Sequence, residues 1–315
     1  MTPFGTLPSG EAVHAIDLAA GDLRARILTY GAILQSLRFR DIPHSLTRGA
    51  EDLDTYLTEK PYHGVIIGPV ANRISNARVR LDGMMYELTR NQDGRINLHS
   101  GGRGTQARVW EVEDCSDAHV TLRCEMQDGD CDLPGRRLFR ATYRIEAPAT
   151  LALDLTCEVD AKTLVNMAHH GFWNLDGTDG WAGHRLRIAA DRYLPTDDDH
   201  CPTGEVAPVD GTPFDLRRGA TPTPGTPPLD HNFCLSDAPV PLRDVLWLTG
   251  TGGVEMTLAT DQPGVQVYDG RPGHHALAIE PQHWPDAPNH RGFPSIVAGP
   301  GAPYRQQTRW RFAAP

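Results

Sequence analysis

The sequence predicts an all-β protein, a large antiparallel sandwich. Many short segments alternate apolar and polar residues, which is the pattern of a strand with one buried face. The 31 glycines and 26 prolines among 315 residues supply turns between those segments. Short strands at even spacing, separated by such turns, are typical of a sandwich. Because no repeat, linker or composition shift marks a boundary, we expect residues 1–315 to form a single domain, although length alone suggests about two.

The expected strands follow from this alternation along the whole chain. They are residues 13–18, 23–34, 64–68, 78–81, 85–88, a strand beginning at Trp110, then 119–126, 138–145, 151–159, 186–190, 254–258, 264–268, 276–280 and 309–312. Asp82-Gly83 predicts a tight hairpin, since glycine takes positive φ without steric cost. Residues 41–61 form a polar connection, and residues 178–229 form long loops across one end of a sheet. The glycine-rich residues 97–105 lack the GxxxxGK[ST] pattern of a phosphate-binding loop.

Composition and charge exclude several classes of partner. The formal net charge of -10 argues against nucleic acid or an anionic membrane as the main partner. No apolar run is long enough to span a membrane, and the N-terminus lacks a basic region followed by an apolar run. The six cysteines form no C-x-x-C pair, and Cys124 and Cys157 lie on apolar strand faces as small hydrophobes. We therefore expect a cytoplasmic protein with free thiols.

The first candidate site lies in residues 165–177, where His169 and His170 are adjacent. These histidines follow the clearly alternating strand 151–159 and should lie on the next strand or at its edge. Neighbouring residues of a strand face opposite sides, so only one of the two can face a given pocket. The alternative is a histidine at the edge of the core that bonds a backbone carbonyl.

The second candidate is Glu280, which ends the apolar run 276–279 and enters a proline-rich loop. Burial there would raise its pKa towards that of a useful general base; the alternative is a strand-end glutamate paired with an arginine. Other polar clusters interrupt strand-like sequence at Asn72-Arg73, His99, residues 230–232 and Gln266. Only the fold could bring these clusters together.

Aromatic residues and histidines near these positions admit both structural and functional interpretations. Phe172, Trp173, Tyr268 and Trp284 could stack on the apolar face of a sugar, although such residues are more often core. The H-x-H and HExxH patterns of metal sites are absent, so we do not expect a catalytic metal.

Sequence motifs in matching order carry a resemblance to a known family over nearly the whole chain. They are Tyr30-Gly31-Ala32, residues 64–74 ending in Ala-Asn-Arg-Ile, Leu81-Asp82-Gly83, Asn97-Leu98-His99, residues 165–177, Pro202-Thr203-Gly204-Glu205, residues 211–215, residues 229–233, residues 264–268, Glu280-Pro281-Gln282 and Pro300-Gly301. No single motif is decisive, but together they are specific. The chain resembles the aldose 1-epimerase (galactose mutarotase) family.

The resemblance implies an all-β super-sandwich with its site in a cleft on the concave face, and it implies a role for each polar cluster. His170 occupies the position of the family's general acid and Glu280 that of its general base. The sugar-binding positions match Asn72, Arg73, His99, Asp230 and Gln266. His169 stands where the family usually has asparagine, so it becomes a supporting residue. Pro69 and Ser100 also depart from the usual pattern, which leaves the sugar preference open.

The implied reaction interconverts the α and β anomers of a free aldose by acid/base ring opening and reclosure. It has no redox step and needs no cofactor. With unperturbed pKa values of about 4.3 and 6.5, Glu280 is ionised and His170 protonated over about two pH units, and we expect the carboxylate to favour the imidazolium. The expected partner is a monosaccharide, and the chain could be a monomer or a homodimer.

Two alternatives to this reaction remain. A hexose-6-phosphate 1-epimerase would need additional arginines or lysines at the cleft, and the net charge of -10 does not support it. Loss of His170 or Glu280 would have favoured the other alternative, a non-catalytic sugar-binding protein, but both residues are present.

Overall fold

The structure, a computed structural model, describes residues 1–271 and 273–315 and consists mainly of strands. The strands are β1 (Thr2–Thr6), β2 (Ala12–Ala20), β3 (Leu23–Leu28), β4 (Leu34–Phe39), β5 (Ile66–Ile67), β6 (Arg73–Ile74), β7 (Arg78–Leu81), β8 (Met84–Glu87), β9 (Asn97–Leu98), β10 (Glu111–Cys115), β11 (His119–Met126), β12 (Arg137–Glu146), β13 (Thr150–Val159), β14 (Thr163–Leu164), β15 (Ala168–His169), β16 (Gly171–Trp173), β17 (Arg185–Ile188), β18 (Arg192–Tyr193), β19 (Ala207–Pro208), β20 (Asp230–Cys234), β21 (Arg243–Thr249), β22 (Glu255–Thr260), β23 (Gly264–Tyr268), β24 (Leu277–Gln282), β25 (Val297–Ala298) and β26 (Tyr304–Ala313). The helix α1 spans Leu53–Thr58, and 3-10 turns span Ser75–Ala77, Gly101–Arg103, Thr105–Ala107, Asp130–Asp132 and Ala287–Asn289.

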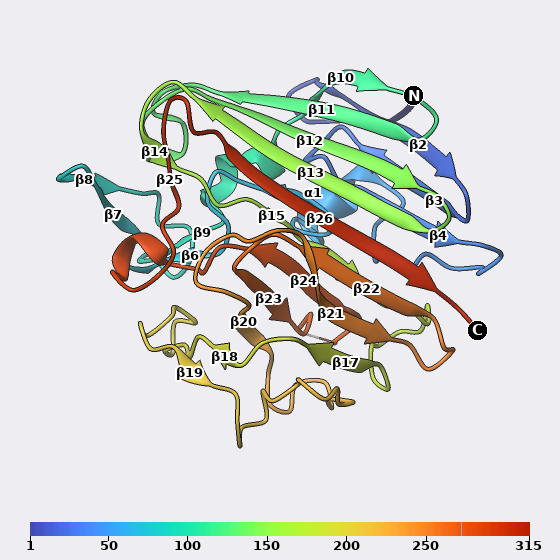
Figure 1. The fold of residues 1–315 in the computed structure, drawn as a ribbon. Helices are drawn as coiled ribbons and strands as arrows, with labels where there is room; N and C mark the ends of the chain where they lie inside the picture. Colours follow the sequence, from blue (N-terminus) through green and yellow to red (C-terminus); the bar gives the residue numbers. More distant parts are fainter. Residues whose placement is uncertain (272) are drawn as a thin grey trace.

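The largest sheet has eight strands in the order β10-β11-β12-β13-β26-β22-β21-β17, and all its neighbours pair antiparallel. It runs from β10 at the top of Figure 1, across the long strand β26, to β17 near the bottom. Strands β12 and β13 pair without interruption from Arg137↔Val159 to Glu146↔Thr150. Their alternating sequences bury one face of each strand, as the period of two requires.

Two further sheets pack against this one. The first, of four strands, has the order β1-β2-β3-β4, and the second, of six strands, has the order β16-β24-β23-β20-β18-β19. Leu37 of β4, Leu153 of β13 and Val267 of β23 belong to the same hydrophobic core, and none of them is exposed. Burial of this shared apolar surface holds the sheets together, and the predicted sandwich is confirmed.

Most expected strands are present with similar bounds; residues 119–126 and 264–268 coincide with β11 and β23. The prediction of an irregular connection at residues 41–61 was wrong in part, because these residues contain helix α1. This helix has only six residues and is preceded by the N-cap Asp52, whose side chain accepts a hydrogen bond from the backbone N–H of Thr55. One turn and a half is too short to produce a recognisable helical period.

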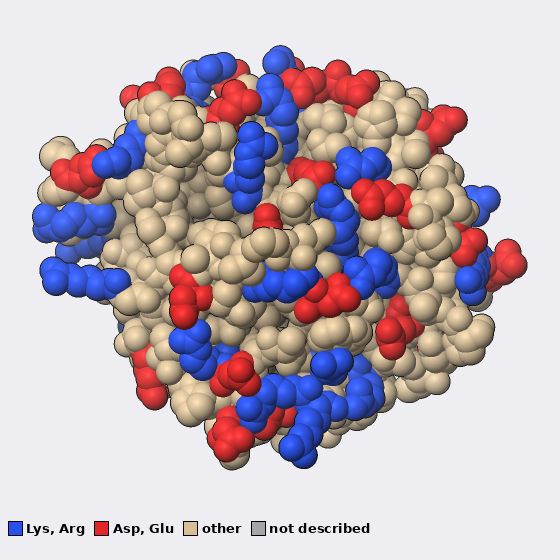
Figure 2. Space-filling model, in the orientation of Figure 1, with Lys and Arg blue, Asp and Glu red and all other residues tan. Residues whose placement is uncertain are grey.

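The surface carries acidic and basic side chains interspersed over the face shown in Figure 2. Ion pairs on the protein surface include Arg136 with Glu125 and Arg26 with Asp17. Within the described part of the chain, no helix has the length and apolar character needed to cross a membrane.

Candidate active site

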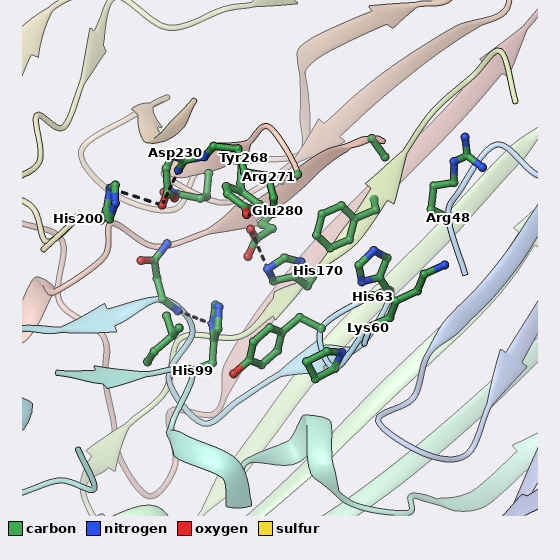
Figure 3. Close-up of a pocket in the computed structure, with 18 of the residues that line it drawn as sticks. Arg48, Lys60, His63, His99, His170, His200, Asp230, Tyr268, Arg271 and Glu280 are labelled. Carbon is green, nitrogen blue, oxygen red and sulfur yellow. Dashed lines mark hydrogen bonds and ion pairs between the residues drawn. The ribbon is translucent and has the colours of Figure 1, made fainter. Parts of the chain in front are cut away.

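A cleft of about 990 Å³ brings together the site residues that the sequence predicted. All seven line it, although they come from six separate parts of the chain: Asn72, Arg73, His99, His170, Asp230, Gln266 and Glu280. Figure 3 shows His170 and Glu280 near the middle of this cleft, with Asp230 towards one end and Lys60 towards the other.

The register of the six-stranded sheet explains why three of these side chains share one face. Gln266 of β23 lies directly opposite Glu280 of β24, and on its other side it lies opposite Asn232 of β20. Directly opposite residues of an antiparallel pair project to the same side, and Asp230, two positions before Asn232, projects there too. The intervening residues Val265, Val267 and Ile279 face the core instead. Glu280 thus lies inside β24 and not at its end, because the strand continues to Gln282.

Alternation also separates the two histidines, as predicted. His170 lines the cleft, whereas the ring of His169 packs in the core against Tyr143 and Trp310. The backbone N–H of His170 donates to the carbonyl of Val65 at 2.9 Å, and its own carbonyl accepts from the N–H of Gly64 at 2.8 Å. These bonds fix the histidine beside the short strand β5.

Asn72 and His99 are joined by two hydrogen bonds, one to a ring nitrogen and one between backbone groups. The N–H of Asn72 donates to Nδ1 of His99, and the N–H of His99 donates to the carbonyl of Asn72, both at 3.0 Å. Both residues have positive φ, 65° and 52°, an uncommon backbone conformation that often occurs at functional sites. Because Nδ1 accepts and burial holds the pKa of His99 well below its usual value, the neutral ring carries its hydrogen on Nε2. His99 is thus a hydrogen-bond donor.

The central pair of the cleft is His170 and Glu280. His170 Nε2 lies 3.5 Å from Glu280 Oε1, and the two side chains are 7% and 2% exposed. Burial raises the pKa of Glu280 well above its ordinary value, and the nearby Asp230 carboxylate adds to this effect. Burial lowers the pKa of His170 to about 4. The expected rise of the Glu280 pKa is confirmed. The expectation that His170 is held as an imidazolium was wrong, because desolvation of the buried ring outweighs the attraction of the Asp230 carboxylate.

Asp230 lies at the centre of a polar cluster at one end of the cleft. Gln266 Nε2 donates to its Oδ1 at 2.8 Å, and a terminal nitrogen of Arg73 lies 3.3 Å from its Oδ2. A terminal nitrogen of Arg271 and Nδ1 of His200 each lie 3.9 Å from the same oxygen. These groups offer both donors and acceptors to the hydroxyls of a sugar.

The four aromatic residues separate into two pairs. Phe172 and Tyr268 line the cleft, with ring centroids 6.3 Å apart. Trp173 and Trp284 are buried, at 0% and 1% exposure, so for these two the core interpretation is confirmed. Phe172 and Tyr268 can thus provide an apolar wall to a bound sugar ring.

Several residues of the cleft were not found from the sequence. They are Arg48, Glu59, Lys60, Pro61, Tyr62, His63, Gln92, Leu98, His200, Gly270, Arg271, His275 and Ala276. Most lie on irregular segments, where no period reports which way a side chain points. Gln92 can be recognised only from a contact in the folded structure, where its Oε1 accepts a hydrogen bond from Nε of Arg73 at 3.1 Å.

Among the described residues, no cluster of three or more His, Cys, Asp or Glu side chains has a geometry that could hold a metal ion. The arrangement offers instead a buried acid/base pair, neutral donors and a carboxylate. Such a site can bind a polyhydroxylated ring and transfer protons to and from it.

Comparison with known proteins identifies the family of this chain. The human galactose mutarotase is 32% identical over 335 residues, covering 98% of this chain and 97% of that protein. The aldose 1-epimerase of Haemophilus influenzae is 29% identical and covers 97% of both chains. The solved structure of a GalM/aldose epimerase homologue from C. elegans superimposes with a TM-score of 0.89 at 30% identity, covering 96% of this chain and 99% of that one. Residues 14–311 match the family model described as aldose 1-epimerase, and the chain therefore belongs to the aldose 1-epimerase family.

Proposed function

We propose that this protein interconverts the α and β anomers of a free aldose, with His170 and Glu280 as the proton-transfer pair. The observation that carries the proposal is the contact of 3.5 Å between these two buried side chains, in a cleft lined by groups suited to hydroxyls. The relatives support it, because proteins named galactose mutarotase and aldose 1-epimerase match almost the whole chain.

In the proposed mechanism, Glu280 takes the proton of the C1 hydroxyl while the bond between C1 and the ring oxygen breaks. The electron pair of that bond remains on the ring oxygen, which takes a proton from Nε2 of His170. The C1–C2 bond then rotates, and the reverse transfers close the ring with the other configuration. Each transfer by a positioned group contributes about 10²–10⁴-fold in rate.

The pKa directions favour these transfers. Ring opening begins after the one proton of the pair has moved from Glu280 to His170, and it ends with both side chains neutral. Burial favours the neutral forms, since it raises the pKa of Glu280 and lowers that of His170. The cleft therefore makes Glu280 a stronger base and His170 a stronger acid than either would be in water.

We further propose that Asn72, Arg73, His99, Asp230 and Gln266 hold the sugar hydroxyls. The support is their common position in the cleft and the donor and acceptor pattern around Asp230. Galactose is the first substrate to test, because the name of the human relative refers to it. A cytoplasmic location is proposed as well, since all six cysteines are free thiols.

A non-catalytic sugar-binding protein is the competing proposal. It would account for the groups around Asp230, but it gives no reason to bury a histidine and a glutamate in contact at the centre of the cleft. Desolvating two ionisable groups is costly, and catalysis gives a reason to tolerate that cost.

Polarimetry on freshly dissolved α-D-galactose tests the proposal directly. We expect the enzyme to accelerate the drift to the equilibrium rotation, with a rate proportional to its concentration. The assay is run with and without prior dialysis against EDTA, because the mechanism has no metal-dependent step. No acceleration of galactose, glucose or a pentose, combined with measurable binding of any of them, would favour the sugar-binding alternative.

A further inference from the structure

The cleft extends beyond the groups proposed to bind one sugar ring. Its volume of about 990 Å³ is near the upper limit for drug-sized ligands, about 300–1,000 Å³. In Figure 3, His170 lies between the Asp230 cluster at one end and Lys60, His63 and Arg48 at the other. These three residues line the same cleft, yet the proposed mechanism uses none of them.

Backbone carbonyls hold two of these residues, both cations, at this end. The N–H of Arg48 donates to the carbonyl of Phe172 at 2.8 Å, and its guanidinium donates to the carbonyl of Thr178. Nζ of Lys60 donates to the carbonyl of Gly49, the residue after Arg48, at 3.0 Å. Both side chains are partly buried. Lys60 is thus tied to the residue that follows Arg48.

Neither cation has a neutralising partner in the part of the chain that the structure describes. Within residues 1–271 and 273–315, no carboxylate forms an ion pair with Arg48 or Lys60, whereas at the other end Arg73 pairs with Asp230 and Arg271 with Asp269. Nε of Arg48 is buried and lacks a hydrogen-bond partner among these residues, and only one of the three Lys60 donors is accounted for. Glu59 lines the cleft too, but it is exposed.

His63 does not supply this end with a third charge. Its ring stacks on Phe172 with centroids 4.0 Å apart, and burial lowers its pKa to about 3, with His170 and Lys60 adding to the effect. The neutral ring forms a flat wall beside the two cations. This end of the cleft therefore combines two unpaired positive charges with apolar surface, which suits an anionic group carried on a sugar.

We propose that this end of the cleft is a subsite for a negatively charged group on C6 of the substrate, either a carboxylate or a phosphate. The inference rests on the proposed function, which places the ring oxygen at His170 and the C1 hydroxyl at Glu280. The ring oxygen is bonded to C1 and C5. With the C1 hydroxyl at Glu280 and the remaining ring hydroxyls at the Asp230 cluster, the substituent on C5 is the one free to extend past His170 towards Arg48 and Lys60.

The test compares anomer exchange by NMR for three matched sets of sugars. These are neutral D-galactose and D-glucose, their C6 carboxylates D-galacturonate and D-glucuronate, and their 6-phosphates, each corrected for its spontaneous rate. We expect one charged class to exceed the neutral parents by about tenfold or more in kcat/KM, since a bond to a charged group is worth about one factor of ten. The class with the higher value identifies the anion as carboxylate or phosphate. The preference should weaken with added salt, because screening reduces the attraction of partly exposed charges.

Variants then assign the preference to this end of the cleft. In Lys60→Gln and in Arg48→Gln the ratio of charged to neutral kcat/KM should fall about tenfold, and Arg48→Lys should retain part of it. Arg305→Gln is the matched control, since Arg305 is exposed on β26 outside the cleft. Because Lys60 and Arg48 are changed separately, a folding defect in one variant leaves the other informative.

Each remaining outcome has a definite meaning. If neutral aldoses exchange at least as fast as both charged classes, the subsite proposal is overturned while the proposed function stands. If a charged class is preferred but both glutamine variants keep the ratio, the anion binds elsewhere and the proposal is again overturned. If no sugar is accelerated, the proposed function itself has failed.

Discussion

Nε2 of His170 lies 3.5 Å from Oε1 of Glu280, although residue 170 follows β15 and residue 280 lies in β24. The approach is set by pairing: β16, which begins at Gly171, pairs with β24 through Gly171↔Ile279. The residue before Gly171 and the residue after Ile279 therefore meet at one place. This juxtaposition is the basis of the predictions that follow.

Glu280→Gln should reduce kcat about 10²-fold or more while changing KM little. The amide keeps the shape of the side chain but cannot take the proton of the C1 hydroxyl. Stopped-flow polarimetry on α-D-galactose measures both constants. Glu255→Gln, on β22 and outside the cleft, is the control. A Glu280→Gln enzyme that is correctly folded and nearly as active as the wild type would remove Glu280 from the mechanism.

His170→Asn should cause a loss of similar size, and the double variant should be little worse than either single one. Both groups transfer protons in the same ring-opening step. Once one transfer is lost, the remaining group can no longer accelerate that step, so its removal costs little more. The measurement is the complete double-mutant cycle in kcat. Two losses that multiply would show that the residues act independently.

The pH dependence of kcat/KM should be bell-shaped, with its acid limb near pH 4. Burial lowers the pKa of His170 to about 4. Below that pH His170 is protonated while Glu280 still holds its own proton, so the pair carries two protons. The alkaline limb marks loss of the last proton, from Glu280, whose pKa is raised well above its ordinary value. Between the limbs the pair holds one proton, which is the number that ring opening requires once that proton has moved from Glu280 to His170. NMR titration of the histidines provides a second measurement: a His170 ring that is charged at pH 6 in the free enzyme would contradict this assignment.

Glu280→Gln should also stabilise the protein at neutral and alkaline pH. The folded-state pKa of Glu280 lies above its unfolded value, so the folded state binds the extra proton. Stability therefore falls as pH rises above the unfolded pKa, about 4.3, until the folded-state pKa is passed. The neutral amide removes this loss, so the gain in Tm should be larger at pH 8 than at pH 4. Scanning calorimetry at both pH values measures it; an equal shift at the two would show that charge burial is not its cause.

Asp230→Ala should raise KM about tenfold or more and should lower kcat by a smaller factor. The substitution removes the acceptor of Gln266 and the partner of Arg73, and so weakens the binding of substrate and transition state together. Initial rates over a range of galactose concentrations separate the two constants. A collapse of kcat at unchanged KM would instead identify Asp230 as a proton-transfer group.

The sequence alone determined the fold class and the strands with strong alternation. In β11 and β13, and in β12 from Phe139 to Ile145, every second residue is apolar, and this local pattern depends only on which face of the strand is buried. Alternation likewise separated His169 from His170. The resemblance of ordered motifs supplied the set of seven cleft residues, all of which the structure brings together. No local pattern identified α1, β20 or β21, since α1 has only six residues and the alternation of β20 is obscured by the polar Asp230, His231 and Asn232.

Tertiary structure alone decided the protonation of the central pair and the extent of the cleft. The expectation of a charged His170 used pKa values for groups in water, whereas burial by distant strands reverses the order of the two pKa values. Arg48 and Lys60 are isolated surface-type residues in the sequence, and their unpaired charges become meaningful only where the chain places them beside Phe172 and His63. Desolvation and charge pairing both depend on neighbours far apart in sequence, which no local pattern records.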